Sequence, residues 1–111
     1  MADERFRTFA EFWPYYVLEH SRPESRLLHF IGSTLSLVTL AAAIVYSPWL
    51  LLAVPVVGYG LAWIGHFAIE KNRPATFKYP LWSLAGDWKM WALMLRGRMA
   101  AEVEKARSAA R

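Results

Sequence analysis

Cysteine is absent from this 111-residue sequence. A chain without thiols forms no disulfide, no iron–sulfur cluster and no thiolate metal site, which leaves histidine and carboxylate side chains as candidate metal ligands. Charge is missing from the centre, because residues 30–69 contain no Asp, Glu, Lys or Arg. With 56% hydrophobic and 20% charged residues, the composition is typical of a membrane protein.

The uncharged centre is long enough for two membrane-spanning helices. One span needs about 20 apolar residues, and we assign residues 27–46 and 49–69 to the two spans. Ser47 and Pro48 separate them, since proline favours an extended residue before it and is well placed at a helix start. We also expect Pro55 to kink the second span.

The distribution of positive charge predicts how this hairpin lies in a membrane. Basic residues crowd the outer ends of the two spans, and the connection between the spans is uncharged. The positive-inside rule therefore places both termini in the cytoplasm. The net charge of +4 lies beside apolar segments, so we expect it to meet anionic lipid headgroups and not nucleic acid.

The segment before the first span contains two helix-start patterns. Thr8 and Glu11 have capping-box spacing and predict a helix through FAEFWPYYVLEH, which Pro14 should distort. The aromatic residues of this helix suit the headgroup zone. Ser21 and Glu24 repeat the capping spacing, so the first spanning helix is expected to begin before residue 27.

Two more helices are expected after the second span. Residues 79–97 are apolar but short for a span and carry Asp87 and Lys89 near the middle, which favours a tilted, re-entrant or interfacial helix. Whether this helix crosses the membrane is left open. A carboxylate in an apolar segment is costly unless it is paired, so Asp87 should have a partner among the histidines, Arg73 or Lys89. Residues 98–111 predict a solvated helix.

The fold class that these segments predict is an all-α membrane protein. A transmembrane helical hairpin with amphipathic or re-entrant helices would form a small helical bundle, and residues 1–111 would be a single integral membrane domain. The oligomeric state is left open, because Gly58 and Gly60 permit close helix contact without the four-residue spacing of a dimer seam.

The three histidines of the chain, His20, His29 and His66, are candidate metal ligands. His29 and His66 are equally distant in sequence from the turn between the spans, so with equal rise in both arms they lie at one depth, ~28 Å from the turn. His20 precedes His29 across a break at Pro23 and can fold back to the same region.

Carboxylates accompany the histidines. Glu19 is next to His20, and Glu70 follows His66 by four residues, on the same face of a helix. With Asp87, they complete a suitable set of ligands for iron(II), manganese or zinc. Three histidines are too few for a di-iron hydroxylase, so we expect at most one metal.

Other functions account for the same residues. Each histidine alone can be an interfacial residue bonded to a headgroup or a carbonyl. The equal depth of His29 and His66 also fits bis-imidazole ligation of haem in an electron carrier. A non-catalytic membrane protein would use the histidines only for structure.

Two motifs in the chain resemble a known family. YYVLEHSRPESRLLHFIG at residues 15–32 and WIGHFAIEKNRPATFKYPLWSLAGD at residues 63–87 resemble the small membrane proteins typified by the fungal endoplasmic-reticulum 2-hydroxy fatty acid dioxygenase, which have bacterial relatives of this length. With the spacing between the motifs, the resemblance covers most of residues 9–97. The chain departs from the family pattern at Ser25, where members carry asparagine, which affects a local hydrogen bond and none of the histidines.

The resemblance implies an activity and a location. The activity is that of an iron(II)-dependent dioxygenase of α-oxidation, which shortens a 2-hydroxy fatty acid or a related lipid by one carbon. Its partners would be that lipid, dioxygen and membrane lipids. The location implied is the bacterial inner membrane.

The resemblance also implies roles for individual residues. His20, His29 and His66 would bind Fe(2+). Glu70 and Arg73 are the candidate catalytic residues, Glu70 as a ligand or a support of the ligands and Arg73 for capture of the substrate carboxylate. The remaining candidates would support the ligands, and they are Glu19, Asn72 and Asp87.

Overall fold

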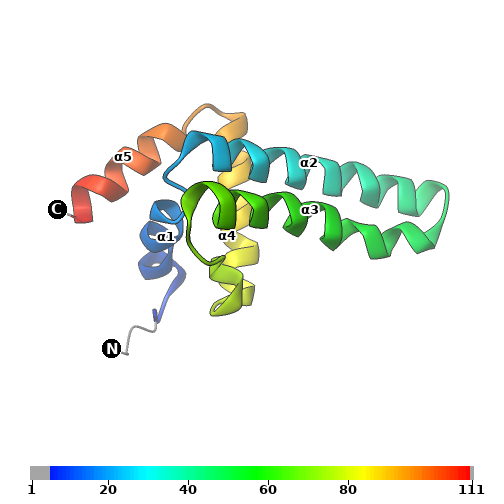
Figure 1. Ribbon diagram of the computed structural model, residues 1–111, viewed down its shortest axis with the longest axis horizontal. Helices are drawn as coiled ribbons and strands as arrows, with labels where there is room; N and C mark the ends of the chain where they lie inside the picture. Colours follow the sequence, from blue (N-terminus) through cyan, green and yellow to red (C-terminus); the bar gives the residue numbers. More distant parts are fainter. Residues whose placement is uncertain (1–5, 111) are drawn as a thin grey trace. The chain divides into compact units, whose positions relative to one another are not determined.

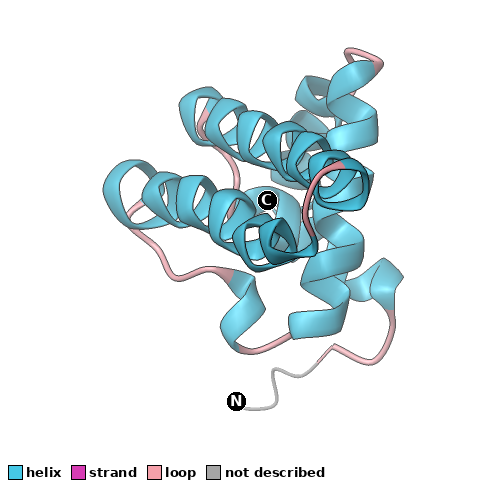
Figure 2. Ribbon diagram, turned by 90° about the vertical axis from the view of Figure 1, so that its right-hand side faces the viewer, coloured by secondary structure: helices cyan, strands magenta, loops and turns pink. Residues whose placement is uncertain are grey.

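The computed structural model describes residues 6–110, and helices are the only regular elements among them (Figure 1, Figure 2). The all-α prediction is therefore confirmed. The chain divides into two compact units, one comprising Met1–Ser21 and Ala75–Arg111 and the other Arg22–Pro74. These are called the terminal unit and the hairpin unit.

The hairpin unit consists of two long antiparallel arms that lie side by side (Figure 1). The first arm is α2 (Pro23–Val45), and the second runs through the 3₁₀ helix η2 (Pro48–Leu52), α3 (Ala53–Ile64) and the π-helix η3 (Gly65–Glu70). Both arms are long and apolar enough to cross a membrane. The two predicted spans are therefore confirmed as helical arms, and the first begins before residue 27 as expected.

The start of α2 differs in detail from the predicted one. Pro23 occupies the first helical position, where its missing N–H costs nothing. The N-cap is Arg22, and its side chain makes no capping hydrogen bond. The predicted capping box of Ser21 and Glu24 is therefore wrong, and the backbone N–H of Arg22 donates instead to the Glu70 carboxylate.

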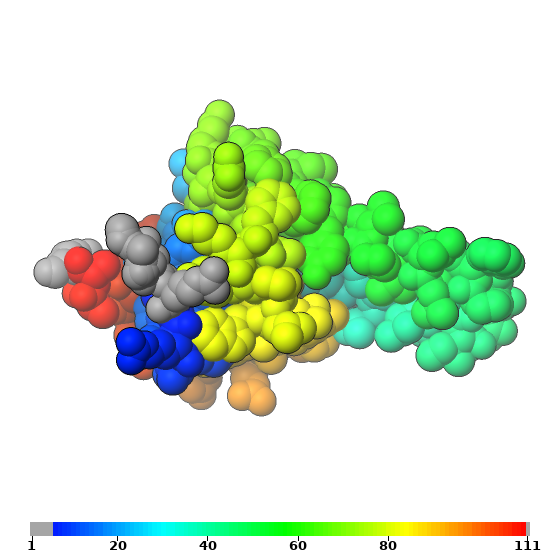
Figure 3. Space-filling model, turned by 90° about the horizontal axis from the view of Figure 1, so that it is seen from below, coloured from blue at the N-terminus to red at the C-terminus, as the bar shows by residue number. Residues whose placement is uncertain are grey.

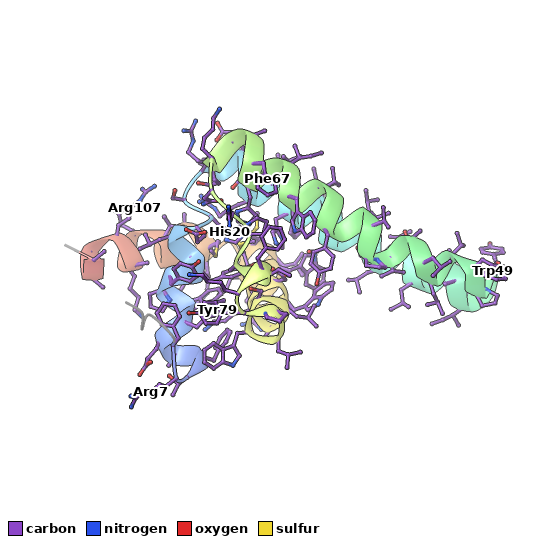
Figure 4. All side chains as sticks on the ribbon, turned by 60° about the horizontal axis from the view of Figure 1, so that its bottom comes forward. Arg7, His20, Trp49, Phe67, Tyr79 and Arg107 are labelled. Atoms are coloured by element: carbon purple, nitrogen blue, oxygen red, sulfur yellow. The ribbon has the colours of Figure 1, made fainter. Side chains whose placement is uncertain are left out.

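The surface of the hairpin is apolar, whereas its buried positions are small or polar. Val38 is 59% exposed and Ile44 is 78% exposed, and Trp49 at the turn is equally exposed (Figure 4). In the space-filling view, side chains of both arms contact one another along the hairpin (Figure 3). Large apolar side chains outside and small or polar ones inside are the distribution expected in lipid. The buried residues of α2 are Ser25, His29, Gly32, Ser33, Ser36 and Ala43.

Glycine brings the two arms into close contact. A Cβ added at Gly32 would lie 3.1 Å from the carbonyl oxygen of Gly58, and a Cβ at Gly58 would lie 2.6 Å from Ser36 Oγ. The Ser36 hydroxyl donates to the carbonyl of Val54 at 2.9 Å, which adds a polar link between the arms. A Cβ at Gly60 would meet no described atom within 4 Å. Of the two glycines that the sequence suggested for close helix contact, Gly58 therefore packs against the other arm and Gly60 does not.

The second arm is not a continuous α-helix. Pro55 is the third residue of α3, so its missing N–H falls in the first helical turn, and the irregular part of the arm is the 3₁₀ helix η2 just before it. A 3₁₀ helix rises about 2.0 Å per residue against about 1.5 Å in an α-helix. The assumption of equal rise in both arms is therefore wrong, and a common depth of His29 and His66 stays a prediction.

The terminal unit contains α1 (Phe9–Leu18), the short 3₁₀ helix η4 (Ala75–Phe77), α4 (Pro80–Leu95) and α5 (Met99–Ala110). The Thr8 hydroxyl accepts the backbone N–H of Glu11 at 3.1 Å, which confirms the predicted start of α1. The helix continues through Pro14, whose ring lies on the exposed side.

Aromatic rings fill the core of the terminal unit. Phe12 and Tyr16 are 0% and 1% exposed, and Trp13 is also buried. Trp13 stacks on Tyr16 with 5.5 Å between ring centres, and Phe12 lies 5.7 Å from Trp82 of α4. These three rings therefore pack against protein, and the expectation that α1 lies in the headgroup zone stays a prediction.

The last helix, α5, is amphipathic. Met99, Val103 and Ala106 follow one another at intervals of three and four residues, and all three are buried in the same cluster as the α1 rings. Trp13 Nε1 donates to the Glu102 carboxylate at 2.8 Å, which ties α1 to α5. The predicted helix is confirmed, but the prediction that it is solvated is wrong for this face.

The helix α4 is built into the terminal unit by its polar residues as well. Lys89 Nζ lies 4.4 Å from a ring centre of Trp13 and 5.5 Å from that of Phe9, which are cation–π contacts. With 16 residues, α4 is not one of the two candidate spans of the described chain. An interfacial or re-entrant position for α4 stays a prediction.

The contact between the arms predicts that substitution is destabilising at Gly58 and not at Gly60. Gly58→Leu should lower the free energy of unfolding by about 1–3 kcal/mol, because its side chain must displace Ser36 and separate the arms. Gly60→Leu gains the same helix propensity without this clash and should cause no loss. Denaturant unfolding in detergent micelles measures both, and equal effects of the two substitutions would contradict the packing described here.

Candidate functional site

His66 lies in the π-helical turn η3, at the end of the second arm. Its backbone carbonyl accepts the N–H groups of Lys71 and Asn72, the second at 2.9 Å. Lys71 ends the helix in the left-handed conformation with φ of 61°, which Gly and Asn adopt more readily than Lys. Single-turn π-helices occur frequently at functional sites, so this turn singles out His66.

The side chain of His66 is held by Asn72. Nδ1 of His66 lies 2.7 Å from Oδ1 of Asn72. Because an amide oxygen only accepts hydrogen bonds, Nδ1 carries the proton and Nε2 carries the lone pair. Metal-binding histidines usually donate their second ring N–H to an oxygen in this way. The contact shows that Asn72 orients the His66 ring, and its role in supporting a metal ligand stays a prediction.

Glu70 joins the end of the second arm to the start of the first. Its Oε2 accepts the backbone N–H of Arg22 at 2.7 Å and the hydroxyl of Ser25 at 2.5 Å. A carboxylate is favourable there, because the N-terminus of α2 offers unpaired N–H groups and the positive end of the helix dipole. Ser25 therefore makes a hydrogen bond although it departs from the family pattern. The contacts give Glu70 a structural role, and its catalytic role stays a prediction.

Small residues let the two arms meet at this end. A Cβ added at Gly65 would lie 3.0 Å from Ser25 Cβ, so the π-helical turn approaches α2 at the level of the Glu70 contact. His29 follows Ser25 by four residues on the same face of α2 and is 6% exposed. The hairpin unit thus buries both of its histidines at the end opposite the turn.

His20 belongs to the terminal unit and lies just beyond the end of α1 (Figure 4). Its Nδ1 is 2.8 Å from the backbone carbonyl oxygen of Tyr16, one helical turn before it. The carbonyl only accepts, so His20 also carries its proton on Nδ1 and its lone pair on Nε2. The imidazole lies against the Tyr16 ring with 4.3 Å between ring centres, and His20 is 2% exposed.

Tyr16 is itself fixed by Asp87. The phenol hydroxyl donates to the Asp87 carboxylate at 2.5 Å, and burial together with this carboxylate raises the pKa of Tyr16 well above its ordinary value. The sequence predicted that Asp87 has a partner, but Tyr16 was not among the candidates. The spacing of four residues between Tyr16 and His20 could have indicated a shared helix face, but it gave no sign of the contact with Asp87.

The remaining candidates, Glu19 and Arg73, are placed differently. Glu19 is the C-cap of α1, where its charge adds to burial in raising the pKa of Tyr15. Arg73 follows the left-handed turn at Lys71 and is exposed. Neither position decides between the roles that the sequence implied, so both roles stay predictions.

The chemistry of the donors fits an iron(II) site, since His20 and His66 both hold the proton on Nδ1 and the lone pair on Nε2. Within residues 6–110, however, no three His, Asp or Glu side chains form a group that could hold a metal ion. His20 belongs to the terminal unit, and His29 and His66 belong to the hairpin unit. The three-histidine site therefore stays a prediction.

The Glu70 contact predicts the effect of a single hydroxyl. Ser25→Ala should lower the free energy of unfolding by about 1.5–3 kcal/mol, the range for a hydrogen bond to a charged group. Ser33→Ala, at a buried serine of the same helix, is the matched control and should cost less. Denaturant unfolding in detergent measures both, and an equal or smaller loss for Ser25→Ala would show that the bond to Glu70 contributes nothing.

Comparison with known proteins supplies one match. The family model described as 2-hydroxy-palmitic acid dioxygenase Mpo1-like matches residues 6–99, a stretch that includes all three histidines and both motifs. No curated protein and no solved structure matches the chain. The family match confirms the resemblance read from the two motifs. The chain belongs to the Mpo1-like family.

Proposed function

We propose that this protein is a membrane-bound, iron(II)-dependent dioxygenase that shortens 2-hydroxy fatty acids by one carbon. Membership of the Mpo1-like family over residues 6–99 carries the proposal, because the family description names a 2-hydroxy acid dioxygenase. The Nδ1 contacts of His20 and His66 support it, because metal-binding histidines usually donate this second ring N–H to an oxygen. Two apolar helices of spanning length support a location in the membrane, where such substrates reside.

In this proposal the metal is held by His20, His29 and His66. Iron(II) would supply the means to bind and activate dioxygen next to the 2-hydroxy acid. Asn72 contributes by keeping the His66 ring in one orientation, and Glu70 contributes by fixing the backbone on which His66 is mounted.

The substrate is proposed to lie with its acyl chain against the apolar arms and its polar end at the level of the buried histidines of the hairpin unit. Arg73 is an exposed cation next to this level, and a guanidinium can bind a carboxylate through two parallel hydrogen bonds. This arrangement would place the carboxyl and hydroxyl groups of the acid at the membrane surface. We also propose that the protein lies in a bacterial inner membrane with both termini in the cytoplasm, as the positive charges at the outer ends of the spans predict.

The overall reaction balances with one molecule of dioxygen. A 2-hydroxy acid and dioxygen give an acid one carbon shorter, carbon dioxide and water, so no further reductant is required. The reaction therefore distinguishes this proposal from that of a haem electron carrier, which would need an external electron donor.

The first functional prediction concerns substrate and metal. Purified protein loaded with iron(II) under anaerobic conditions should consume dioxygen when a long-chain 2-hydroxy acid is added, and should not with the 3-hydroxy acid of the same length. His20→Ala, His29→Ala and His66→Ala should each lower the rate at least about a hundredfold, since each removes a metal ligand. An oxygen electrode and mass spectrometry of the acid product measure the outcome.

Two results would contradict the proposal. One is wild-type protein that retains iron(II) but produces no shortened acid from any 2-hydroxy acid. The other is a Soret band on purification that disappears in His29→Ala and His66→Ala, which would identify a haem protein.

The second functional prediction concerns capture of the carboxylate. Arg73→Gln should raise KM for the 2-hydroxy acid about tenfold or more and change kcat little, because it removes a contact made before and during the reaction. Lys71→Gln removes a neighbouring exposed charge and is the matched control. Steady-state oxygen consumption measures both, and an equal change in KM for the two variants would assign the effect to general charge and not to Arg73.

A further inference from the structure

We propose that Tyr16 and Asp87 are positioning residues for His20. Asp87 holds the phenol, and the phenol and carbonyl of Tyr16 hold the imidazole in one orientation, with the proton on Nδ1 and the lone pair on Nε2. The inference rests on the proposed function in taking a metal ion as the ligand of Nε2. It extends that function by assigning a role to a tyrosine that the ligand set does not include.

The first step is that one residue fixes both the tautomer and the plane of the His20 ring. The Tyr16 carbonyl accepts from Nδ1 at 2.8 Å, which selects the tautomer. The Tyr16 ring lies 4.3 Å from the imidazole centre at an interplanar angle of 32°, which limits rotation of the imidazole. The carbonyl is fixed by the backbone of α1, whereas the ring contact depends on how firmly the Tyr16 side chain is held, and this contact keeps the imidazole turned with Nδ1 toward the carbonyl.

The second step is that Tyr16 is held on three sides. Its hydroxyl donates to Asp87 at 2.5 Å, and the ring of Trp13 stacks on it at an interplanar angle of 14°. A Cβ added at Gly86 would lie 3.1 Å from two atoms of the Tyr16 ring, so glycine lets the backbone of α4 lie against that ring. Gly86 and Asp87 are adjacent, and one turn of α4 therefore fixes both the face and the hydroxyl of Tyr16.

The neighbouring tyrosine shows what such a residue does without this arrangement. Tyr15 is half-buried and packs against Phe6, Phe12 and Tyr79. Tyr15 thus packs in this unit through ring contacts, without the hydrogen bond to Asp87 that Tyr16 makes. A carboxylate placed within an apolar helix is costly, and the cost is explained when the carboxylate orients a group that must stay oriented.

Two roles can be separated by experiment. If the pair only ties α1 to α4, its loss lowers stability and leaves the state of the His20 ring unchanged. If the pair positions His20, its loss changes the distribution of the imidazole proton between Nδ1 and Nε2 in protein that is still folded. The measurement is therefore made on metal-free protein and needs no activity.

The experiment is ¹⁵N NMR of histidine-labelled, metal-free protein in detergent at about pH 8, where an imidazole of ordinary pKa is neutral. The chain has only three histidines, and a His20→Gln variant identifies the His20 signals. Wild-type His20 should show the Nδ1–H tautomer alone. Asp87→Leu and Tyr16→Leu should show both tautomers, whereas Asp87→Asn keeps an accepting oxygen and should restore the wild-type signal.

Matched controls and metal binding complete the test. Tyr15→Phe should leave the His20 signals unchanged, and the His66 signals should be unchanged in every variant, which also reports that the hairpin unit is folded. Titration with cobalt(II), followed by its visible absorption, should show an affinity about tenfold or more lower for Asp87→Leu than for Asp87→Asn.

Unchanged His20 signals in folded Asp87→Leu would overturn the proposal and leave the pair as a structural tie. If Tyr16→Leu does not fold, the two Asp87 variants still decide. Failure of the proposed function gives a different result, namely wild-type protein that consumes no dioxygen while His20 responds to Asp87→Leu as described.

Discussion

The close approach of the two arms at Gly32 and Gly58 is the contact on which the hairpin unit depends. Lipid gives no hydrophobic drive for helices to associate, so packing and internal hydrogen bonds must supply the attraction. Glycine on both arms permits that packing, and the Ser36 hydroxyl on Val54 adds a bond that lipid cannot replace. Without this contact, the residues at the open end of the hairpin would have no fixed partner arm.

His20 and His66 are oriented in the same way although they lie in different units. His66 donates Nδ1–H to the side-chain amide oxygen of Asn72, and His20 donates Nδ1–H to the backbone carbonyl oxygen of Tyr16. Each support is local in sequence, within six residues for His66 and four for His20. The support of His66 therefore lies within its own helix end, whereas the Tyr16 side chain that lies against His20 is itself held by Asp87 of α4.

Much of the helical architecture could be predicted from the sequence, because apolar surroundings require long uncharged segments. The absence of charge over residues 30–69 identified both arms, and Thr8 identified the start of α1. The π-helix and the 3₁₀ helix could not be predicted, since the uncharged apolar run that indicates a spanning helix does not distinguish them from an α-helix. Tyr16 was missed for a similar reason, because a tyrosine in an aromatic segment gives no sign of a carboxylate that lies 71 residues away.

The hydrogen bonds of Glu70 make the hairpin a closed ring. The polypeptide joins the arms at residues 46–48, and the carboxylate joins them again at the opposite end through Arg22 and Ser25. These hydrogen bonds oppose separation of the arms, because the arms cannot part at this end without breaking charge-assisted bonds. His29 and His66 therefore lie between two connections of the arms, the polypeptide turn at one end and the Glu70 hydrogen bonds at the other.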